Sequence, residues 1–255
     1  MWVAAATQGA AQTPVDWRAE GSFPLQYIQT STSTSNTRIT NAIPYLGLTG
    51  TTAIYPDLYA SLFANGGHAP LGSFPDTDNT FASGGSRVAG RWGAFSAGVS
   101  FEHIHYFQGM FDEETNIAND TNLFAGYRWA PNPGLRISPS AVVTMRADET
   151  LAVQRYSFSG RFDIEQRLTQ QWWFLASSRF RRLDYVGRES GRREARLAFV
   201  TGLKYVVTDS MSARMLAGWE HRDSTVSSRI ASRFTIGASL DFDIDFSRIG
   251  LPAGR

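Results

Sequence analysis

Hydrophobic and polar residues alternate strictly near the end of the chain, from Phe234 to Phe246. Side chains of a strand point to opposite faces with a period of two, so this stretch predicts a strand with one apolar and one polar face. Asp241, Asp243 and Asp245 make the polar face acidic. The run is longer than the usual soluble strand of about 5–6 residues, and it suits a strand that crosses a bilayer at a tilt.

The same alternation recurs along the chain and predicts twelve strands. They are expected at residues 16–29, 38–49, 54–64, 81–92, 95–106, 122–129, 135–146, 153–168, 172–185, 195–207, 211–222 and 229–246. Every even-to-odd connection is a short turn, such as Gly50-Thr51-Thr52, whereas most odd-to-even connections are long and polar. Residues 107–120 are one of these long connections.

An even strand number, with short turns at one end and longer loops at the other, is typical of bacterial outer-membrane barrels. We therefore expect an all-β fold: a twelve-stranded antiparallel transmembrane β-barrel over residues 15–246, with short periplasmic turns and longer extracellular loops. Residues 1–14 are expected to be a flexible lead-in or a signal-peptide remnant, and residues 247–255 a C-terminal tail. The alternative is a soluble β-sandwich, which buries its apolar faces between two sheets.

Composition agrees with a barrel. The chain is 42% hydrophobic and contains no run of about 18 apolar residues, as a transmembrane helix would require. Aromatic rings gather at the short-turn end, and Trp and Tyr favour the membrane–water interface. The expected interfacial aromatics are Trp17, Trp92, Trp129, Trp172, Trp173 and Tyr205.

Charge and cysteine content exclude some functions. The formal net charge is +1, which favours no nucleic-acid partner. The absence of cysteine excludes disulfides and thiolate zinc sites.

The closing strand also carries a short motif, made of Thr235, Gly237, Leu240, Phe242 and Phe246. This motif resembles the C-terminal recognition signal of bacterial outer-membrane barrel proteins. The second half of the chain, from about Tyr156, resembles the porin-like barrel families of Gram-negative bacteria. The resemblance implies a place in the bacterial outer membrane, in contact with its lipid and lipopolysaccharide. It also implies insertion by the outer-membrane assembly machinery and leaves room for unidentified protein partners.

Two groups of charged residues are candidates for chemistry. The ladder of Asp241, Asp243 and Asp245 offers oxygen ligands for calcium, but pairing with Arg18 and Arg214 on neighbouring strands is the favoured interpretation. The other group is basic and lies on two strands and their loop: Arg179, Arg181, Arg182, Arg188, Arg192, Arg193 and Arg196. It is either a solvated rim, paired with Asp184, Glu189 and Glu194, or an electropositive vestibule that attracts anions.

No catalytic constellation is recognisable. His103 and His105 share a strand face beside Glu102 and are a weak candidate for a metal site, with a loop-edge position as the alternative. His68 and His221 form no constellation, and no histidine is followed two residues later by a serine, as in outer-membrane lipases and deacylases. We therefore expect no catalytic residue, no metal and no cofactor, and a protein that is not an enzyme.

The favoured function is an outer-membrane, porin-like channel for passive passage of small solutes, with anions as the candidate class. The residues expected to line the pore and set its selectivity are Arg155, Arg161, Glu165, Arg179, Arg181, Arg196, Lys204, Arg214, Glu220 and Arg233. The alternatives are a structural or secretion-associated barrel without a free pore and, less favoured, an outer-membrane hydrolase.

Overall fold

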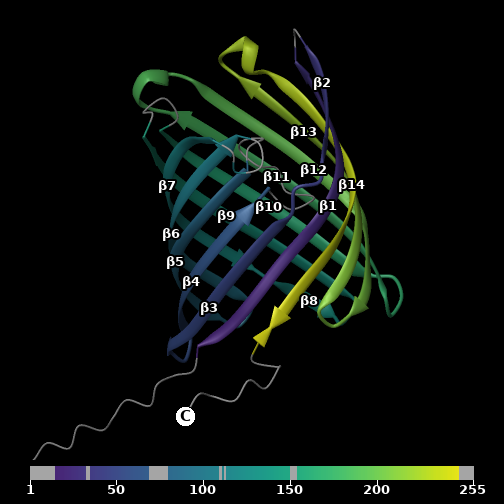
Figure 1. Ribbon diagram of the computed structural model, residues 1–255. Helices are drawn as coiled ribbons and strands as arrows, with labels where there is room; N and C mark the ends of the chain where they lie inside the picture. Colours follow the sequence, from purple (N-terminus) through teal and green to yellow (C-terminus); the bar gives the residue numbers. More distant parts are fainter. Residues whose placement is uncertain are drawn as a thin grey trace, which may run out of the picture.

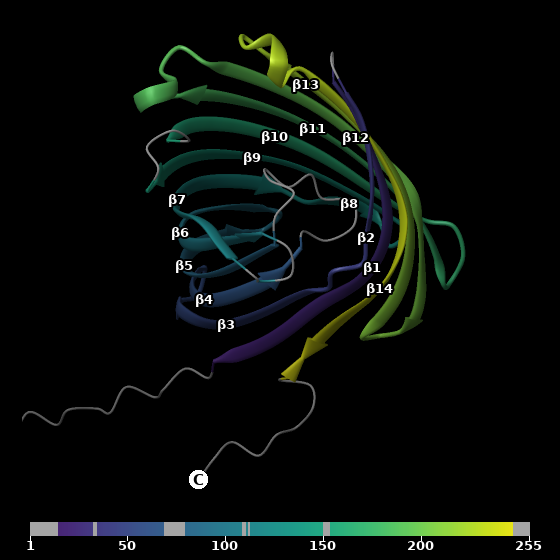
Figure 2. The same cartoon turned by 45° about the horizontal axis from the view of Figure 1, so that its top comes forward.

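The structure is a computed structural model that describes residues 15–32, 35–68, 80–108, 111, 113–149 and 154–246. The expectations for residues 1–14 and 247–255 lie outside the described residues. Strands of the described chain form one antiparallel sheet that closes on itself as a barrel (Figure 1). Figure 2 shows the same strands as a closed ring. The closed ring excludes the two-sheet sandwich.

Twelve strands build the barrel wall, as the sequence predicts. β2 and β3 pair with successive parts of β1, and β8 continues β7 along β9, so each pair of segments counts as one wall strand. The segments are β1 (Asp16–Thr32), β2 (Asn36–Asn41), β3 (Tyr45–Tyr55), β4 (Leu58–Gly67), β5 (Thr80–Trp92), β6 (Phe95–Gln108), β7 (Glu113–Tyr127), β8 (Trp129–Asn132), β9 (Leu135–Asp148), β10 (Arg155–Arg167), β11 (Trp172–Tyr185), β12 (Arg193–Thr208), β13 (Met211–Ser224) and β14 (Ala231–Asp245).

The last strand closes the ring. β14 pairs with β1 in one unbroken register, from Arg18 opposite Asp245 to Thr32 opposite Ala231. The inward-pointing residues of β14 therefore lie beside the inward-pointing residues of β1. We call this pair of strands the seam of the barrel. The pairing of the last strand with the first, which a closed barrel requires, is thus present.

The two ends of the barrel differ. Short turns such as Pro56-Asp57, Gly93-Ala94 and Pro133-Gly134 lie at one end, where β1 also starts and β14 ends (Figure 1). We call this the periplasmic end and the opposite end the extracellular end. The extracellular end carries the 3₁₀ turns η1 (Gly187–Glu189) and η2 (Ser227–Arg229).

The described residues include no helix that is long and apolar enough to cross a membrane.

One predicted turn is wrong. β3 runs straight through Gly50-Thr51-Thr52 and the chain reverses at Pro56-Asp57. Proline fixes the φ angle that the second position of a β-turn needs, and aspartate is also a turn former. Gly50 has another role, because a Cβ there would lie 2.9 Å from the ring of Trp17. Gly50 therefore does not form a turn. It leaves space for the ring of Trp17 on the neighbouring strand.

Two long connections of the prediction are also wrong. β6 extends to Gln108 and β7 begins at Glu113, so most of residues 107–120 is strand. Similarly, β1 continues to Thr32 and β2 starts at Asn36. The ends of these hairpins are polar on both faces, so their sequence shows no alternation.

The outer face of the barrel is apolar and the inner face is polar. Leu25, Leu123 and Met215 are 60–66% exposed although they are large hydrophobic residues. Their strand neighbours of opposite parity point inward and are mostly polar or charged. Exposed apolar residues in such a continuous surface are stable only against lipid, so the wall is a transmembrane one.

We expect Gly202→Ala to lower the free energy of unfolding by roughly 1–3 kcal/mol, as overpacking does. A Cβ at Gly202 would lie 2.0 Å from the backbone oxygen of Met215 on β13, so the two strands would have to separate. Gly160→Ala is the matched control, because nothing lies within 4 Å of a Cβ there. Urea unfolding in lipid vesicles measures both changes, and equal effects would contradict the packing argument.

Candidate functional site

Two adjoining cavities occupy the periplasmic half of the barrel interior, with volumes of about 880 and 550 Å³. Glu20 and Tyr45 line both, so we treat them as one space, the periplasmic vestibule. The hydroxyl of Tyr45 donates to Glu20 over 3.1 Å and to Asn65 over 3.2 Å. The Tyr45 side chain thus stands between the two parts of the vestibule.

The aspartate ladder lies in the wall of the vestibule and is paired with arginines. The carboxylate of Asp241 accepts hydrogen bonds from Nε and Nη2 of Arg214, over 2.5 and 2.6 Å. Asp243 pairs in the same two-pronged way with Arg18 of β1. Both arginines are the ones that strand adjacency predicted, so this interpretation is confirmed for Asp241 and Asp243.

Other predicted lumen residues also line the vestibule. Glu165 pairs with Arg136 over 3.4 Å, and Lys204 lies beside Arg214 in the strand register. Lys204 is the only lysine of the chain. Lys204 makes no hydrogen bond or ion pair with any residue that the structure describes.

Trp173 is not an interfacial aromatic. Its ring lines the vestibule, with the guanidinium groups of Arg136 and Arg167 at 4.9 and 5.9 Å from the ring centre. Adjacent residues of a strand point to opposite faces, so Trp172 and Trp173 could not both face lipid. The other predicted interfacial rings lie on the outer face near the periplasmic end: Trp17, Trp92, Trp129, Trp172 and Tyr205.

Towards the extracellular end, arginines of β11–β14 point into the interior. We call Arg179, Arg181, Arg196, Arg222 and Arg233 the arginine layer. The space that Arg179, Arg181 and Arg196 enclose with Ala198 and Glu220 is only about 10 Å³. Arg181 and Arg196 are each only 8% exposed. These arginines are thus closely packed along one side of the interior, beyond the vestibule.

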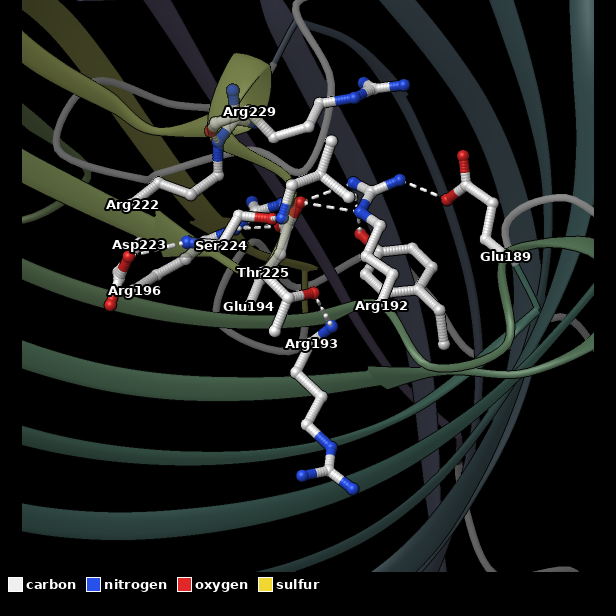
Figure 3. A network of polar contacts seen from close by, with 12 residues as sticks. Glu189, Arg192, Arg193, Glu194, Arg196, Arg222, Asp223, Ser224, Thr225 and Arg229 are labelled. Atoms are coloured by element: carbon white, nitrogen blue, oxygen red, sulfur yellow. Dashed lines mark hydrogen bonds and ion pairs between the residues drawn. The ribbon is translucent and has the colours of Figure 1, made fainter.

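A network of ion pairs ties the β11–β12 loop to the arginine layer (Figure 3). The carboxylate of Glu194, whose side chain is fully buried, accepts hydrogen bonds from Arg192 and Arg196. Arg192 also pairs with Glu189 and lies over the ring of Tyr185, at 3.9 Å from its centre. Burial disfavours the charge of Arg192, but the hydrogen bond to Glu194 and the electrostatic attraction of Tyr185, Glu194 and Glu189 together outweigh it and raise the pKa of the guanidinium.

The basic residues that the sequence analysis grouped together lie on both faces of the barrel wall. Arg182 and Arg193 point outward and share Asp184, over 3.2 and 3.4 Å. Arg179, Arg181 and Arg196 point inward. The predicted partners Asp184, Glu189 and Glu194 are confirmed. The side chain of Arg188 lies outside the described residues.

The remaining predicted lumen residues are on the inner face as well. Arg155 is 5% exposed and lies 5.8 Å from the ring centre of Tyr185, and Arg161 pairs with Asp163 over 2.8 Å. Glu220, 8% exposed, lies opposite Arg233 in the register. All the predicted lumen residues therefore share the interior, divided between the vestibule and the region of the arginine layer.

Sequence analysis missed a buried ion pair between β7 and β9. Arg146 donates to both carboxylate oxygens of Asp120, over 2.7 and 2.5 Å, and the two side chains are 5% and 11% exposed. Nearby, Asp148 accepts a hydrogen bond from Asn116 over 2.5 Å. The sequence does contain a signal for these residues, because the alternation along β9 places Arg146 and Asp148 on its polar, inner face.

His103 and His105 point outward, away from the vestibule that Glu102 lines. Nδ1 of His103 lies 2.8 Å from Oδ1 of Asn119, and Nδ1 of His105 lies 2.7 Å from a carboxylate oxygen of Glu114. Among the residues that the structure describes, no group of three or more His, Asp or Glu is arranged to hold a metal. Whether the protein has enzymatic activity stays a prediction.

The motif of the closing strand has residues on both faces. Thr235 and Gly237 point inward, whereas Leu240 and Phe242 point outward; Phe246 follows the strand. The ring of Phe242 covers Gly21 of β1, where a Cβ would lie 2.4 Å from it. The motif thus packs the barrel seam, and its role in assembly stays a prediction.

No protein-family model matches the sequence, and no curated protein does. Solved structures are similar in fold. An outer-membrane channel from Pseudomonas putida F1 is 10% identical, with a TM-score of 0.59 over 95% of this chain and 100% of the other. A bacterial polysaccharide outer membrane secretin is 11% identical, with a TM-score of 0.49 over 92% and 100%. The NanC porin is 10% identical, with a TM-score of 0.45 over 85% and 98%.

The likeness to the Pseudomonas channel spans nearly the whole of both chains. It agrees with the outer-membrane location that the sequence predicts, and with the apolar outer face of the barrel. The chain has the fold of the bacterial outer-membrane β-barrels.

Proposed function

We propose that the chain is an outer-membrane channel for passive passage of small solutes, with a preference for anions. The arginine layer carries this proposal. Its five guanidinium groups belong to four neighbouring strands and point into the interior, where Arg181 and Arg196 are each only 8% exposed. A narrow region lined by one sign of charge concentrates counter-ions and repels ions of its own sign.

The wide vestibule fits this function. Arg18, Arg136 and Arg214 pair with carboxylates of the vestibule. A solute that arrives from the periplasmic side therefore meets no strong electrostatic barrier. The fold likeness to a Pseudomonas outer-membrane channel is a further support. We propose the lipid and lipopolysaccharide of the outer membrane as surroundings of the barrel and, during insertion, the assembly machinery as its partner.

One observation favours a second candidate, a structural barrel without a free pore. Arg179, Arg181 and Arg196 are closely packed, with only about 10 Å³ between them, and Arg196 is held by Glu194 in the network of Figure 3. Such a barrel would insert into membranes and carry no steady current.

Single-channel recording in planar bilayers tests the proposal. We expect discrete conductance steps and an anion-to-cation permeability ratio above 1. Arg181→Gln removes one charge and keeps a polar side chain, and it should bring the ratio closer to 1. Arg181→Ser also removes bulk and should raise the conductance severalfold.

Arg182→Gln is the matched control, because Arg182 is the next residue on the same strand and points outward. It should change neither conductance nor selectivity. A reconstituted barrel that passes no current, even as Arg181→Ser, would reject the channel in favour of the structural barrel.

A further inference from the structure

The strand register sets four side chains of the vestibule wall next to one another. Arg167 of β10 lies opposite Trp173 of β11. Trp173 in turn lies opposite Lys204 of β12, and Lys204 lies opposite Arg214 of β13. Side chains directly opposite in antiparallel strands have Cβ atoms about 4.5–5.5 Å apart, so neighbours among these four are within reach of one another. An aromatic ring therefore lies between cationic side chains on the inner wall.

The charge of Lys204 is not compensated by a carboxylate of the described chain. Both oxygens of Asp241 accept hydrogen bonds from Arg214, whereas Lys204 makes no hydrogen bond or ion pair with a described residue. The other carboxylates of this part of the vestibule are Glu165 and Asp243, which pair with arginines, Glu20, which accepts a hydrogen bond from Tyr45, and Asp209 in the turn after β12. The ammonium group of Lys204 is therefore available to an anion that enters the vestibule.

An apolar surface lies beside this ammonium group. The ring of Trp173 and the side chains of Leu175 and Val206 line the same cavity, whose volume is about 550 Å³. The guanidinium groups of Arg136 and Arg167 lie 4.9 and 5.9 Å from the centre of the Trp173 ring, and such cation–π contacts hold the ring in place. A fixed aromatic surface and a cation thus share one cavity.

We propose that Trp173 and Lys204 form a binding site in the vestibule for a small carboxylate that carries an aromatic ring. The carboxylate pairs with the ammonium group of Lys204, and the ring of the ligand packs against Trp173 and Leu175. Ring contacts and the burial of apolar surface favour such a ligand over an aliphatic carboxylate of the same charge. This inference deepens the proposed function, because it names a class of solute for the lumen and rests on the entry of anions into it.

The only lysine of the chain gives the test a single reporter. Reductive methylation with ¹³C-formaldehyde labels the amine of Lys204 and keeps its positive charge. Nuclear magnetic resonance of the full-length barrel in detergent micelles then follows this signal during a titration with sodium benzoate, with the methylated N-terminal amine as the internal reference.

We expect benzoate to shift the Lys204 signal in a saturable way. Half of the shift should occur at a concentration at least about tenfold below that of sodium acetate, because acetate has the charge but no ring to bury. Benzyl alcohol has the ring but no charge and should require at least about tenfold more than benzoate. Equal responses to benzoate and acetate, or to benzoate and benzyl alcohol, would overturn the proposal.

Trp173→Leu should raise the half-saturation concentration of benzoate at least about tenfold and change that of acetate less than about twofold, because it removes the aromatic surface and leaves the amine. Trp172→Leu is the matched control, because Trp172 is the next residue on the same strand and lies on the outer face. It should change neither value. Unchanged benzoate binding in Trp173→Leu, or an equal loss in Trp172→Leu, would reject the site.

Lys204→Gln serves as the test if Trp173→Leu does not fold. Isothermal titration calorimetry replaces the lost label, and the affinity for benzoate should fall at least about tenfold, whereas Lys204→Arg keeps the charge and should stay within about threefold of the natural chain. Full affinity in Lys204→Gln would contradict the proposed pairing.

The two proposals fail in different ways. A barrel that prefers benzoate to acetate but carries no current retains the site and loses the channel. A barrel that conducts with anion preference, and whose Lys204 signal responds to benzoate and acetate alike, retains the channel and loses the site.

Discussion

Replacing Glu194 by glutamine should lower the free energy of unfolding by about 3–5 kcal/mol, the usual effect of removing one partner from a buried ion pair. The Glu194 side chain is fully buried, and its two oxygens accept hydrogen bonds from two arginines. Glutamine keeps the size but offers one neutral oxygen, so Arg192 and Arg196 lose their common counter-ion. Urea unfolding in lipid vesicles, followed by tryptophan fluorescence, measures the change.

Asp184→Asn is the control for Glu194→Gln. Asp184 also serves two arginines, but its side chain is 44% exposed and those of Arg182 and Arg193 are 56% and 68% exposed. Water and salt screen such a pair, so we expect a loss of less than about 1 kcal/mol. Similar losses for both variants would show that burial does not decide the strength of these ion pairs.

A second large effect is expected from arginine on the lipid-facing surface. Ser177 and Ser178 are neighbours in the middle of β11 and point to opposite faces. Ser178→Arg puts a charge into the hydrocarbon core and should lower the free energy of unfolding by about 2–4 kcal/mol. Ser177→Arg puts the same group into the lumen, opposite Asp163, and should change it by less than about 1 kcal/mol.

The same unfolding measurement in vesicles compares the two serine variants. Their side chains are identical and their Cα atoms are adjacent, so only the direction of the side chain differs. If Ser177→Arg were the more harmful change, the assignment of inner and outer faces would be reversed.

Alternation was sufficient to predict much of the fold. A period of two fixes which side chains share a face, and barrel closure fixes which strands are neighbours. For this reason the pairing of the ladder with Arg18 and Arg214 was predictable, although Arg18 and Asp243 lie at opposite ends of the sequence.

The prediction failed where the sequence pattern has another cause. Gly50 resembles a turn residue, but it makes room for the ring of Trp17. Residues 113–121 resemble a loop because they carry polar groups on both faces, as a hairpin that extends beyond the lipid does. Hydropathy alone does not distinguish such a hairpin from a loop.

The candidate site was predictable in composition but not in its arrangement. Parity assigns Arg181, Arg196 and Arg222 to the inner face, but only the strand register brings them into one row. The same is true of Arg146 and Asp120, whose contact depends on the offset between β7 and β9. Register depends on the lengths of the hairpins, and those were misjudged in the first half of the chain.

The seam between β1 and β14 also bears on the order of events in folding. Every other neighbouring pair of wall strands is joined by one hairpin, whereas the seam joins residues such as Arg18 and Asp245 across almost the whole described chain. Contacts of such long sequence separation form late, because a large loop must first be closed. Until β14 is available, β1 and β13 are two open sheet edges, which readily pair with other chains. The sheet therefore keeps exposed edges until β14 has been synthesised and has paired with β1.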